Sequence, residues 1–342
     1  MSKISLSANE KQRLYEAKLF KTSVMQSFWS PFMGTDTASA VQQKMDSKRK
    51  GERVQFGYRS RLDPSSVITN GDLEGNEDTL DYKYDEVILD NYRKAVRTDS
   101  ELQEIQAYFD LPSDIESAIV DYQTELIDAL IFKAVFSTTS ATQYYVGGGS
   151  TLGGLTSSNK LSPDVLTELY ALANTGKSRT YEPIRPIKIG GKNYFGLVAH
   201  PDVVADLRKD SDMKQSLENG WLRGESNPLF TAADLVYNNI MVFSDRRAPI
   251  GTSGSATYGR ALLFGQQACV FAMGRMPKII RKGFDYDDEM GIGTSVICGA
   301  KAPVFNGQRY GSILVNAFRS SVSGADNKSE IDYSKIVTAN QG

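Results

Sequence analysis

The fold is decided by residues 111–136, which read LPSDIESAIVDYQTELIDALIFKAVF. Apolar side chains recur along this stretch at spacings of four, three, four and four residues: Ile115, Ile119, Tyr122, Leu126 and Leu130. This spacing places them on one stripe of an amphipathic α-helix. At about 1.5 Å per residue, such a helix is roughly 39 Å long. A helix of that length needs a sheet or another helix along its apolar stripe, so we expect it to organise the surrounding fold.

Immediately before this helix, residues 51–97 predict a long two-stranded β-hairpin. Apolar and polar residues alternate in both arms, which is typical of strands with one apolar and one wet face. The apolar positions are Val54, Phe56, Tyr58 and Leu62 in the first arm, and Leu80, Tyr82 and Tyr84 in the second. Residues 63–79 between the arms are rich in Pro, Asn, Gly and Asp, which indicates a loop. The alternation changes phase near Asp85–Glu86, which predicts a β-bulge there.

The length of this hairpin suggests how it is used. Residues 51–62 extend about 40 Å at roughly 3.3 Å per residue, whereas a compact chain of this size has a radius of gyration near about 20 Å. An isolated two-stranded hairpin is marginally stable in water, so its aromatic side chains need another surface. A neighbouring subunit is the natural candidate, and the alternative is the protomer's own body. We predict intersubunit contacts at Phe56, Tyr58, Arg59, Arg61, Asn70, Glu74, Asn76, Tyr82 and Tyr84.

Residues 1–50 have the character of an N-terminal arm. Ser7 and Glu10 form a capping box ahead of a helical stretch that reaches Phe28. A second helical turn or two is predicted over Ala38–Met45. The basic run Lys48-Arg49-Lys50 that follows fits either a solvated loop or a site for an acidic partner.

Beyond residue 137 the pattern mixes helices and strands, which favours the α+β class. The expected elements are a Gly-rich loop over 138–160, a helix over Pro163–Ala173, a hairpin at Gly190-Gly191, a helix over Pro201–Leu207, a strand over Ile240–Ser244, and strands over about 277–284, 294–304 and 308–318. An Asn306-Gly307 turn separates the last two strands. The tail from Ser320 is polar.

Composition excludes several classes of protein. The 342 residues carry a formal net charge of -2, whereas a dedicated nucleic-acid binder normally carries a basic surplus. No run of 18 apolar residues and no signal segment are present, so we expect a cytoplasmic origin. The two cysteines, Cys269 and Cys298, are too few for a disulfide framework. Histidine is the commonest general base and metal ligand, and the chain has only one, which disfavours a catalytic or metal site.

Three motifs fail as sites of chemistry. Residues 171–178 end in Gly-Lys-Ser like a phosphate-binding loop, but Ala171 replaces the first glycine and a helix precedes instead of a strand. The acidic residues of 285–289 lack the glycine and glutamate of a calcium loop, which indicates a solvated turn. His200 precedes a helix start at Pro201 and is expected to pack or cap. We therefore predict no catalytic residue, no metal ligand and no cofactor-binding residue.

Six short motifs in collinear order resemble one protein family. They are 71–80 (GDLEGNEDTL), 93–97 (RKAVR) with 109–111 (FDL), Ile127-Asp128 with Phe132, His200-Pro201 with 206–208 (DLR), 227–230 (NPLF), and 305–307 (FNG) with Tyr310-Gly311. The resemblance covers roughly residues 45–318 and is to the major capsid proteins of tailed bacteriophages, in the branch of short-tailed phages. These proteins share the Johnson fold.

The resemblance implies an α+β capsid fold divided along the chain. The implied parts are an N-terminal arm (1–50), an extended hairpin loop (51–97), a peripheral domain with a long spine helix (98–159 and 275–319), an axial domain (160–274) and a C-terminal tail (320–342).

The resemblance also implies a structural function and no enzymatic one. A major capsid protein self-assembles as pentamers and hexamers into an icosahedral shell that encloses a double-stranded DNA genome. Implied partners are portal, scaffolding and decoration proteins, with DNA held without sequence-specific binding and no membrane. The implied location is the virion capsid, after assembly in the host cytoplasm. Two alternatives stay open: an encapsulin-like compartment shell, and a nucleotide-binding enzyme built on Gly176-Lys177-Ser178.

Overall fold

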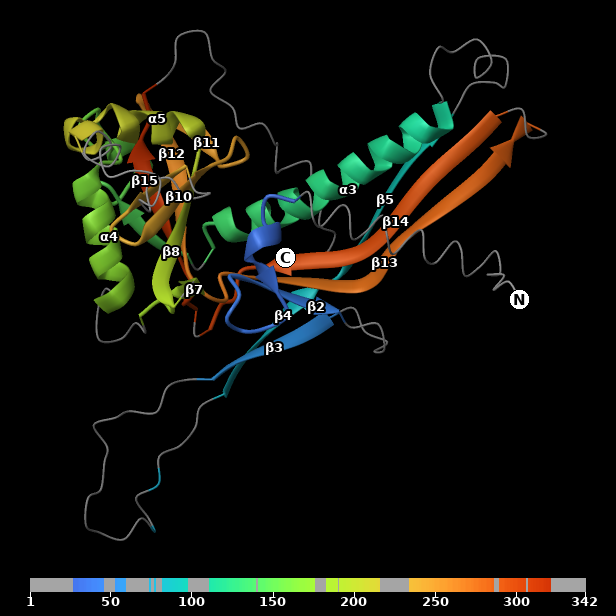
Figure 1. Cartoon of the computed structure of the whole chain (residues 1–342), viewed down its shortest axis with the longest axis horizontal. Coiled ribbons are helices and arrows are strands. Elements are labelled where there is room, and N and C mark those ends of the chain that lie inside the picture. The colour runs from blue at the N-terminus through green and yellow to red at the C-terminus, as the bar shows by residue number, and fades with distance from the viewer. Residues whose placement is uncertain are drawn as a thin grey trace, which may run out of the picture.

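The computed structural model describes most of the chain between residues 27 and 320. The described residues are 27–45, 53–59, 74, 77, 82–97, 111–139, 141–175, 183–189, 191–215, 234–285, 289–305 and 307–320. Within them the fold is α+β and is built on two large sheets and a separate hairpin (Figure 1). The predicted helix over residues 7–28, the basic run 48–50 and the tail after Ser320 lie almost entirely outside the described residues.

The first sheet, which we call the spine sheet, has five strands. In order they are β1 (Met33–Gly34), β2 (Val41–Met45), β13 (Cys269–Phe284), β14 (Glu289–Lys301) and β5 (Asp90–Arg97). Helix α3 (Leu111–Phe136) runs along one face of this sheet, as Figure 1 shows. Ile115 and Ile119 of α3 pack on Ile279 and Ile292 of the sheet. The predicted central helix is therefore confirmed, with the predicted bounds.

The second sheet, which we call the larger sheet, has eight strands. Its order is β6 (Thr142–Tyr145), β15 (Ser312–Phe318), β12 (Ala256–Phe264), β8 (Lys192–Ala199), β10 (Ile240–Ser244) and β9 (Leu235–Tyr237), with β11 (Ile250–Ser253) beside β12 and β7 (Ile187–Ile189) beside β8. Helices α4 (Pro163–Thr175) and α5 (Pro201–Lys209) bury Leu166, Leu169 and Leu207 in its core. Two short 3-10 helices complete the described elements, η1 (Ser30–Phe32) and η2 (Leu152–Gly154).

The hairpin pairs β3 (Arg53–Arg59) with β4 (Tyr82–Ile88) and projects away from α3 in Figure 1. The register runs from Arg53 opposite Ile88 to Arg59 opposite Tyr82 without a shift. The predicted bulge at Asp85–Glu86 is therefore wrong. The apparent change of phase arises because β4 carries tyrosines on its outer face and Val87 on its inner face.

Three further predictions about local structure are wrong. Residues 41–45 form strand β2 instead of a helix, because they pair in parallel with β13 and bury Val41. The segment 138–160 was predicted to be a loop, but it contains strand β6, which pairs with β15. After Leu89, residues 90–97 leave the hairpin and join the spine sheet. Local sequence cannot reveal pairings between strands that lie more than 150 residues apart in the chain.

The sheets also divide the chain differently from the expected segments. β6 and β15, which were expected beside the spine helix, pair within the larger sheet. The helix over Pro163–Thr175, the hairpin formed by β7 and β8, the helix from Pro201 and the strand Ile240–Ser244 are confirmed.

Candidate functional site

The inner face of the hairpin is buried by the protomer itself. Phe56 and Tyr58 are 3% and 5% exposed and pack against Phe305. The ring of Tyr58 stacks on that of Tyr310, with 5.6 Å between centroids. The guanidinium of Arg185 lies 4.7 Å from the Tyr58 ring centroid and donates a hydrogen bond of 3.1 Å to the Tyr58 hydroxyl. The prediction that Phe56 and Tyr58 reach a neighbouring subunit is therefore wrong for both residues.

We expect Tyr58→Phe to reduce the free energy of unfolding by about 1.5–3 kcal/mol. The substitution keeps the stacked ring but removes the hydroxyl that accepts from the charged Arg185, and such hydrogen bonds contribute about that much. Urea unfolding of the purified protomer measures the change. Tyr84→Phe is the matched control and should leave the midpoint unchanged, because Tyr84 is exposed. Equal midpoints for Tyr58→Phe and the wild type would contradict this account.

The outer face of the hairpin presents two uncovered aromatic rings. Tyr82 and Tyr84 are 56% and 68% exposed. Tyr84 lies across the strand over Gly57, where a side chain would come within 3.3 Å of its ring. Side chains alternate along a strand, and Val87 of β4 is fully buried, so Tyr82 and Tyr84 lie on the opposite face of this strand. Both rings thus remain free to contact another molecule.

The remaining predicted contact residues are placed only in part. Glu74 is exposed. Arg61, Asn70 and Asn76 lie outside the described residues, as does the side chain of Arg59.

An ionic network fixes the root of the hairpin to the spine sheet. The Nζ of Lys301 donates to Asp85 Oδ1 at 2.6 Å and to the carbonyl oxygen of Glu86 at 3.2 Å. Asp85 Oδ2 accepts from the backbone nitrogen of Val304 at 3.0 Å. Glu86 also pairs with Arg53 across the hairpin. The outer face of the hairpin is therefore held in a defined orientation relative to the body.

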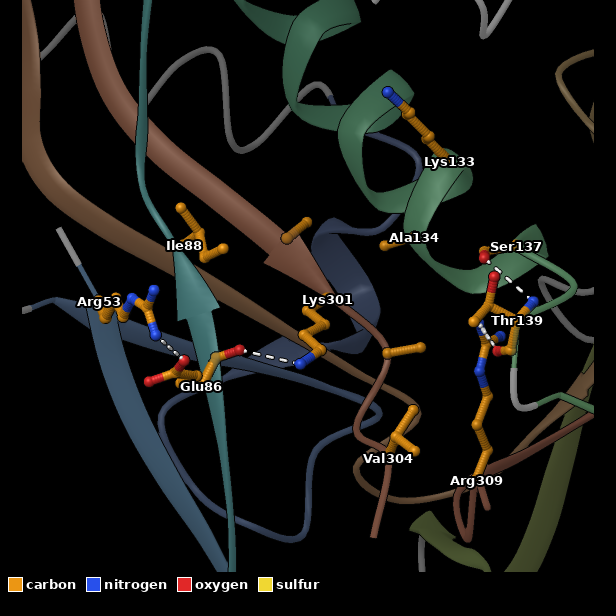
Figure 2. A pocket seen from close by; sticks show the side chains of 12 residues that line it. Arg53, Glu86, Ile88, Lys133, Ala134, Ser137, Thr139, Lys301, Val304 and Arg309 are labelled. Atoms are coloured by element: carbon orange, nitrogen blue, oxygen red, sulfur yellow. Dashed lines mark hydrogen bonds and ion pairs between the residues drawn. The ribbon is translucent and has the colours of Figure 1, made fainter. Parts of the chain in front are cut away.

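Beside this network lies a cavity of about 550 Å³, shown in Figure 2. Its lining carries one carboxylate, Glu86, and four cations: Arg53, Lys133, Lys301 and Arg309. Arg309 donates to the carbonyl oxygens of Val135 and Thr139 at 2.9 and 3.1 Å and so caps the end of α3. Burial lowers the pKa of Lys133. The excess of cations over carboxylates in this lining favours an anionic group.

Comparison with known proteins decides which family this architecture represents. The phage capsid protein family matches residues 4–144 and 133–317, which together span most of the chain. The chain belongs to the phage capsid protein family. This is a family of structural proteins and not a class of enzymes.

Individual relatives agree with this assignment of the capsid protein. The major capsid protein of Pseudomonas phage KPP25 is 25% identical over 340 residues, which cover 87% of this chain and 90% of that protein. Among solved structures, the capsid of Ralstonia phage GP4 has a TM-score of 0.76 at 21% identity, covering 95% of this chain and 97% of that one. The capsid of cyanophage Pam1 has a TM-score of 0.75 at 20% identity, covering 87% and 94%. The predicted α+β capsid fold is thereby confirmed.

The cysteines, His200 and the Gly-Lys-Ser motif, which were weighed as sites of chemistry, lie in surroundings that suit a structural role. Burial raises the pKa of both Cys269 and Cys298 to about 12, so their thiols stay protonated. His200 caps α5, and its Nδ1 accepts from the backbone nitrogen of Asp202 at 3.3 Å. Residues 176–178 follow helix α4 and not a strand, which is the wrong context for a phosphate-binding loop.

Metal-binding clusters and membrane-spanning helices are both absent from the described residues. Within them, no group of three or more His, Cys, Asp or Glu side chains is placed to hold a metal ion. No helix in the described part of the chain is both long and apolar enough to cross a lipid bilayer.

A buried ionic junction was missed by sequence reasoning. Asp128 of α3 is 1% exposed and accepts from Ser27 Oγ at 2.5 Å and from the backbone nitrogen of Phe28 at 3.1 Å. It also pairs with Arg247, which pairs in turn with Asp245 at 2.8 Å. The junction joins the N-terminal segment, the spine helix and the turn after β10. The sequence feature that could have indicated this junction is Asp128, a carboxylate within the apolar run at the end of α3.

Proposed function

We propose that this chain is the major subunit of a tailed-phage capsid and that it self-assembles, as pentamers and hexamers, into an icosahedral shell around double-stranded DNA. The observation that carries the proposal is a hairpin fixed at its root whose outer face exposes Tyr82 and Tyr84. Aromatic residues dominate the energetics of protein interfaces. Its relative in Pseudomonas phage KPP25 is named a major capsid protein, which supports the same role here.

Assembly from such a subunit depends on many modest contacts. Each subunit touches several neighbours, so weak pairwise interfaces add up to a stable closed shell through multivalency. Weak single contacts also let misplaced subunits dissociate before the shell closes. The formal charge of -2 suits a shell that encloses DNA without binding it tightly.

We assign the parts of the chain by the same reasoning. Residues 51–89 act as the extended loop that lies over an adjacent subunit, and the expected end at residue 97 is moved back because 90–97 form β5 of the spine sheet. Helix α3 and the spine sheet form the peripheral domain. The larger sheet with α4 and α5 forms the axial domain, and it includes β6 and β15 from the segments 98–159 and 275–319 that were expected in the peripheral domain. Residues 1–50 form the arm and 320–342 the tail. Portal, scaffolding and decoration proteins complete the particle, which assembles in the host cytoplasm.

Replacing both outer tyrosines tests this function. We expect Tyr82→Ala with Tyr84→Ala to leave a folded, soluble protomer and to lower the yield of shells at least tenfold. Both rings are exposed, so their loss removes intersubunit contact without opening the core. Electron microscopy of particles from cells that make the full chain measures the yield.

The matched control keeps the rings. Tyr82→Phe with Tyr84→Phe should assemble at close to the normal yield, because the buried aromatic area is unchanged. A normal number of shells from the double alanine variant would show that this face makes no essential contact.

A further inference from the structure

The N-terminal half of helix α3 has one face that none of the described elements covers. This face carries three exposed carboxylates, Asp114, Asp121 and Glu125. Their spacings of seven and four residues place them on one stripe of the helix, which we call the outer stripe. Among the described residues, none of the three takes part in a hydrogen bond or an ion pair. The helix has no Lys or Arg before Lys133, so α3 itself supplies no cation beside the stripe.

The line of the outer stripe continues into the buried junction at Asp128, seven residues beyond Asp121. There the N-terminal segment is already held on α3, because Ser27 donates its hydroxyl to Asp128. One turn further along α3, the ring of Trp29 lies 5.3 Å from that of Phe132, between centroids. From residue 27 to residue 29 the chain therefore runs along α3 in the same direction as the helix.

The chain that precedes Ser27 starts beside the outer stripe. Toward its C-terminus α3 is enclosed on all sides, since residues 127–132 are at most 6% exposed, and Figure 1 shows the segment 27–34 beside this half. Toward its N-terminus the outer stripe is open. Followed backward in the same direction, the stripe presents Asp121 about 10 Å and Asp114 about 21 Å before Asp128, at roughly 1.5 Å per helical residue.

The charge of residues 1–26 is complementary to this face. The segment holds five cations and two carboxylates, a net charge of +3 in a chain whose formal net charge is -2: Lys3, Lys11, Arg13, Lys18 and Lys21, with Glu10 and Glu16. The sequence predicts a helix that begins at Ser7 and reaches Phe28. At the same rise per residue, Lys21 and Arg13 precede Ser27 by about 9 and 21 Å, which matches the positions of the two aspartates before Asp128.

We infer that residues 7–26 dock along the outer stripe of α3 in their own chain, with the cations of the segment paired to the carboxylates of the stripe. The same chain is the occupant because the residue that follows the segment, Ser27, is held at Asp128 of that helix. Docking withholds these cations from DNA and from other subunits. The inference concerns a single protomer, so it does not depend on the proposed function.

A double charge reversal tests the inference on the purified full-length protomer. Exposed ion pairs are individually weak, so neutralising one carboxylate is not enough. Asp114→Lys with Asp121→Lys should speed the hydrogen exchange of residues 7–26 roughly tenfold or more, as measured by mass spectrometry, because like charges then face the segment. Adding Arg13→Glu with Lys21→Glu to the same chain should restore slow exchange.

The matched control reverses two exposed carboxylates away from α3. Asp164 lies in the first turn of α4, as Asp114 does in α3, and Asp212 follows α5. Asp164→Lys with Asp212→Lys should leave the exchange of residues 7–26 as in the wild type. Equal exchange in the wild type and in the Asp114→Lys, Asp121→Lys variant would overturn the inference. Slow exchange that appears only with added DNA would overturn it too, and would identify the segment as a phosphate contact.

A second measurement uses the wild-type chain. In a dilute mixture of isotope-labelled and unlabelled protomers, a carbodiimide should join Lys18 or Lys21 to Asp121 or Glu125 within one copy. Links formed only between labelled and unlabelled copies would overturn the inference and would place the segment on a neighbouring subunit. Links of these lysines only to carboxylates outside α3 would overturn it as well.

Discussion

Replacing Asp128 by asparagine is expected to lower the free energy of unfolding by about 3 kcal/mol. Removing one partner of a buried ion pair costs about 3–5 kcal/mol, because the other charge stays buried. Asp245 remains as a partner of Arg247, so the lower end of that range applies. The loss also weakens the bonds that hold Ser27 and Phe28 on the spine helix.

Denaturant unfolding of the purified protomer measures this loss as a lower midpoint at an unchanged slope. Asp121→Asn is the matched control, because Asp121 lies on the same helix and is exposed. It should change the free energy of unfolding by less than about 0.5 kcal/mol. A loss below about 1 kcal/mol for Asp128→Asn would mean that the junction adds little to stability.

Trp29→Ala should destabilise the protomer by about 3–5 kcal/mol, the usual cost of truncating a buried large aromatic side chain. Trp29 is fully buried, and its ring lies 5.3 Å from that of Phe132 and 5.5 Å from that of Phe264, between centroids. These two rings belong to the spine helix and to β12. Truncation therefore opens a void where the N-terminal segment joins both sheets.

Trp29→Phe gives a sharper test of the same packing. The indole Nε1 of Trp29 has no hydrogen-bond acceptor among the described residues, so phenylalanine removes an unsatisfied donor along with some area. We expect it to cost less than about 1.5 kcal/mol. Thermal unfolding followed by circular dichroism ranks the two variants, and equal losses would show that the aromatic contacts do not set the stability.

Sequence patterns predicted the elements whose packing is local in the chain. The bounds of α3 follow from its repeating apolar stripe, because a helix displays its buried face every three or four residues. The pairing of β3 with β4 was predicted for a similar reason. Which face of that hairpin is buried could not be predicted, because both faces carry aromatic side chains. The buried face is the one that packs against Phe305, a residue far along the chain.

The rest depends on contacts between distant segments. Residues 41–45 were predicted to be helical because nothing in the neighbouring sequence indicates their parallel pairing with β13. The pairing of β5 with β14 was missed for the same reason, since the two strands lie about 200 residues apart in the chain. Of the predicted contact residues, Tyr82 and Tyr84 keep the expected exposure, whereas Phe56 and Tyr58 do not.

The near-continuity of β4 and β5 has a mechanical consequence. Only Leu89 separates them, so tension applied to the hairpin by a neighbour passes along one extended chain into the spine sheet. β5 is paired with β14 from Asp90 to Arg97, and a pull along the strand axis shears all of these hydrogen bonds at once. Bonds strained together resist far more force than bonds that open one after another. In a shell under outward pressure, each subunit would thus be loaded along the strand axis of β5, the direction in which it resists extension best.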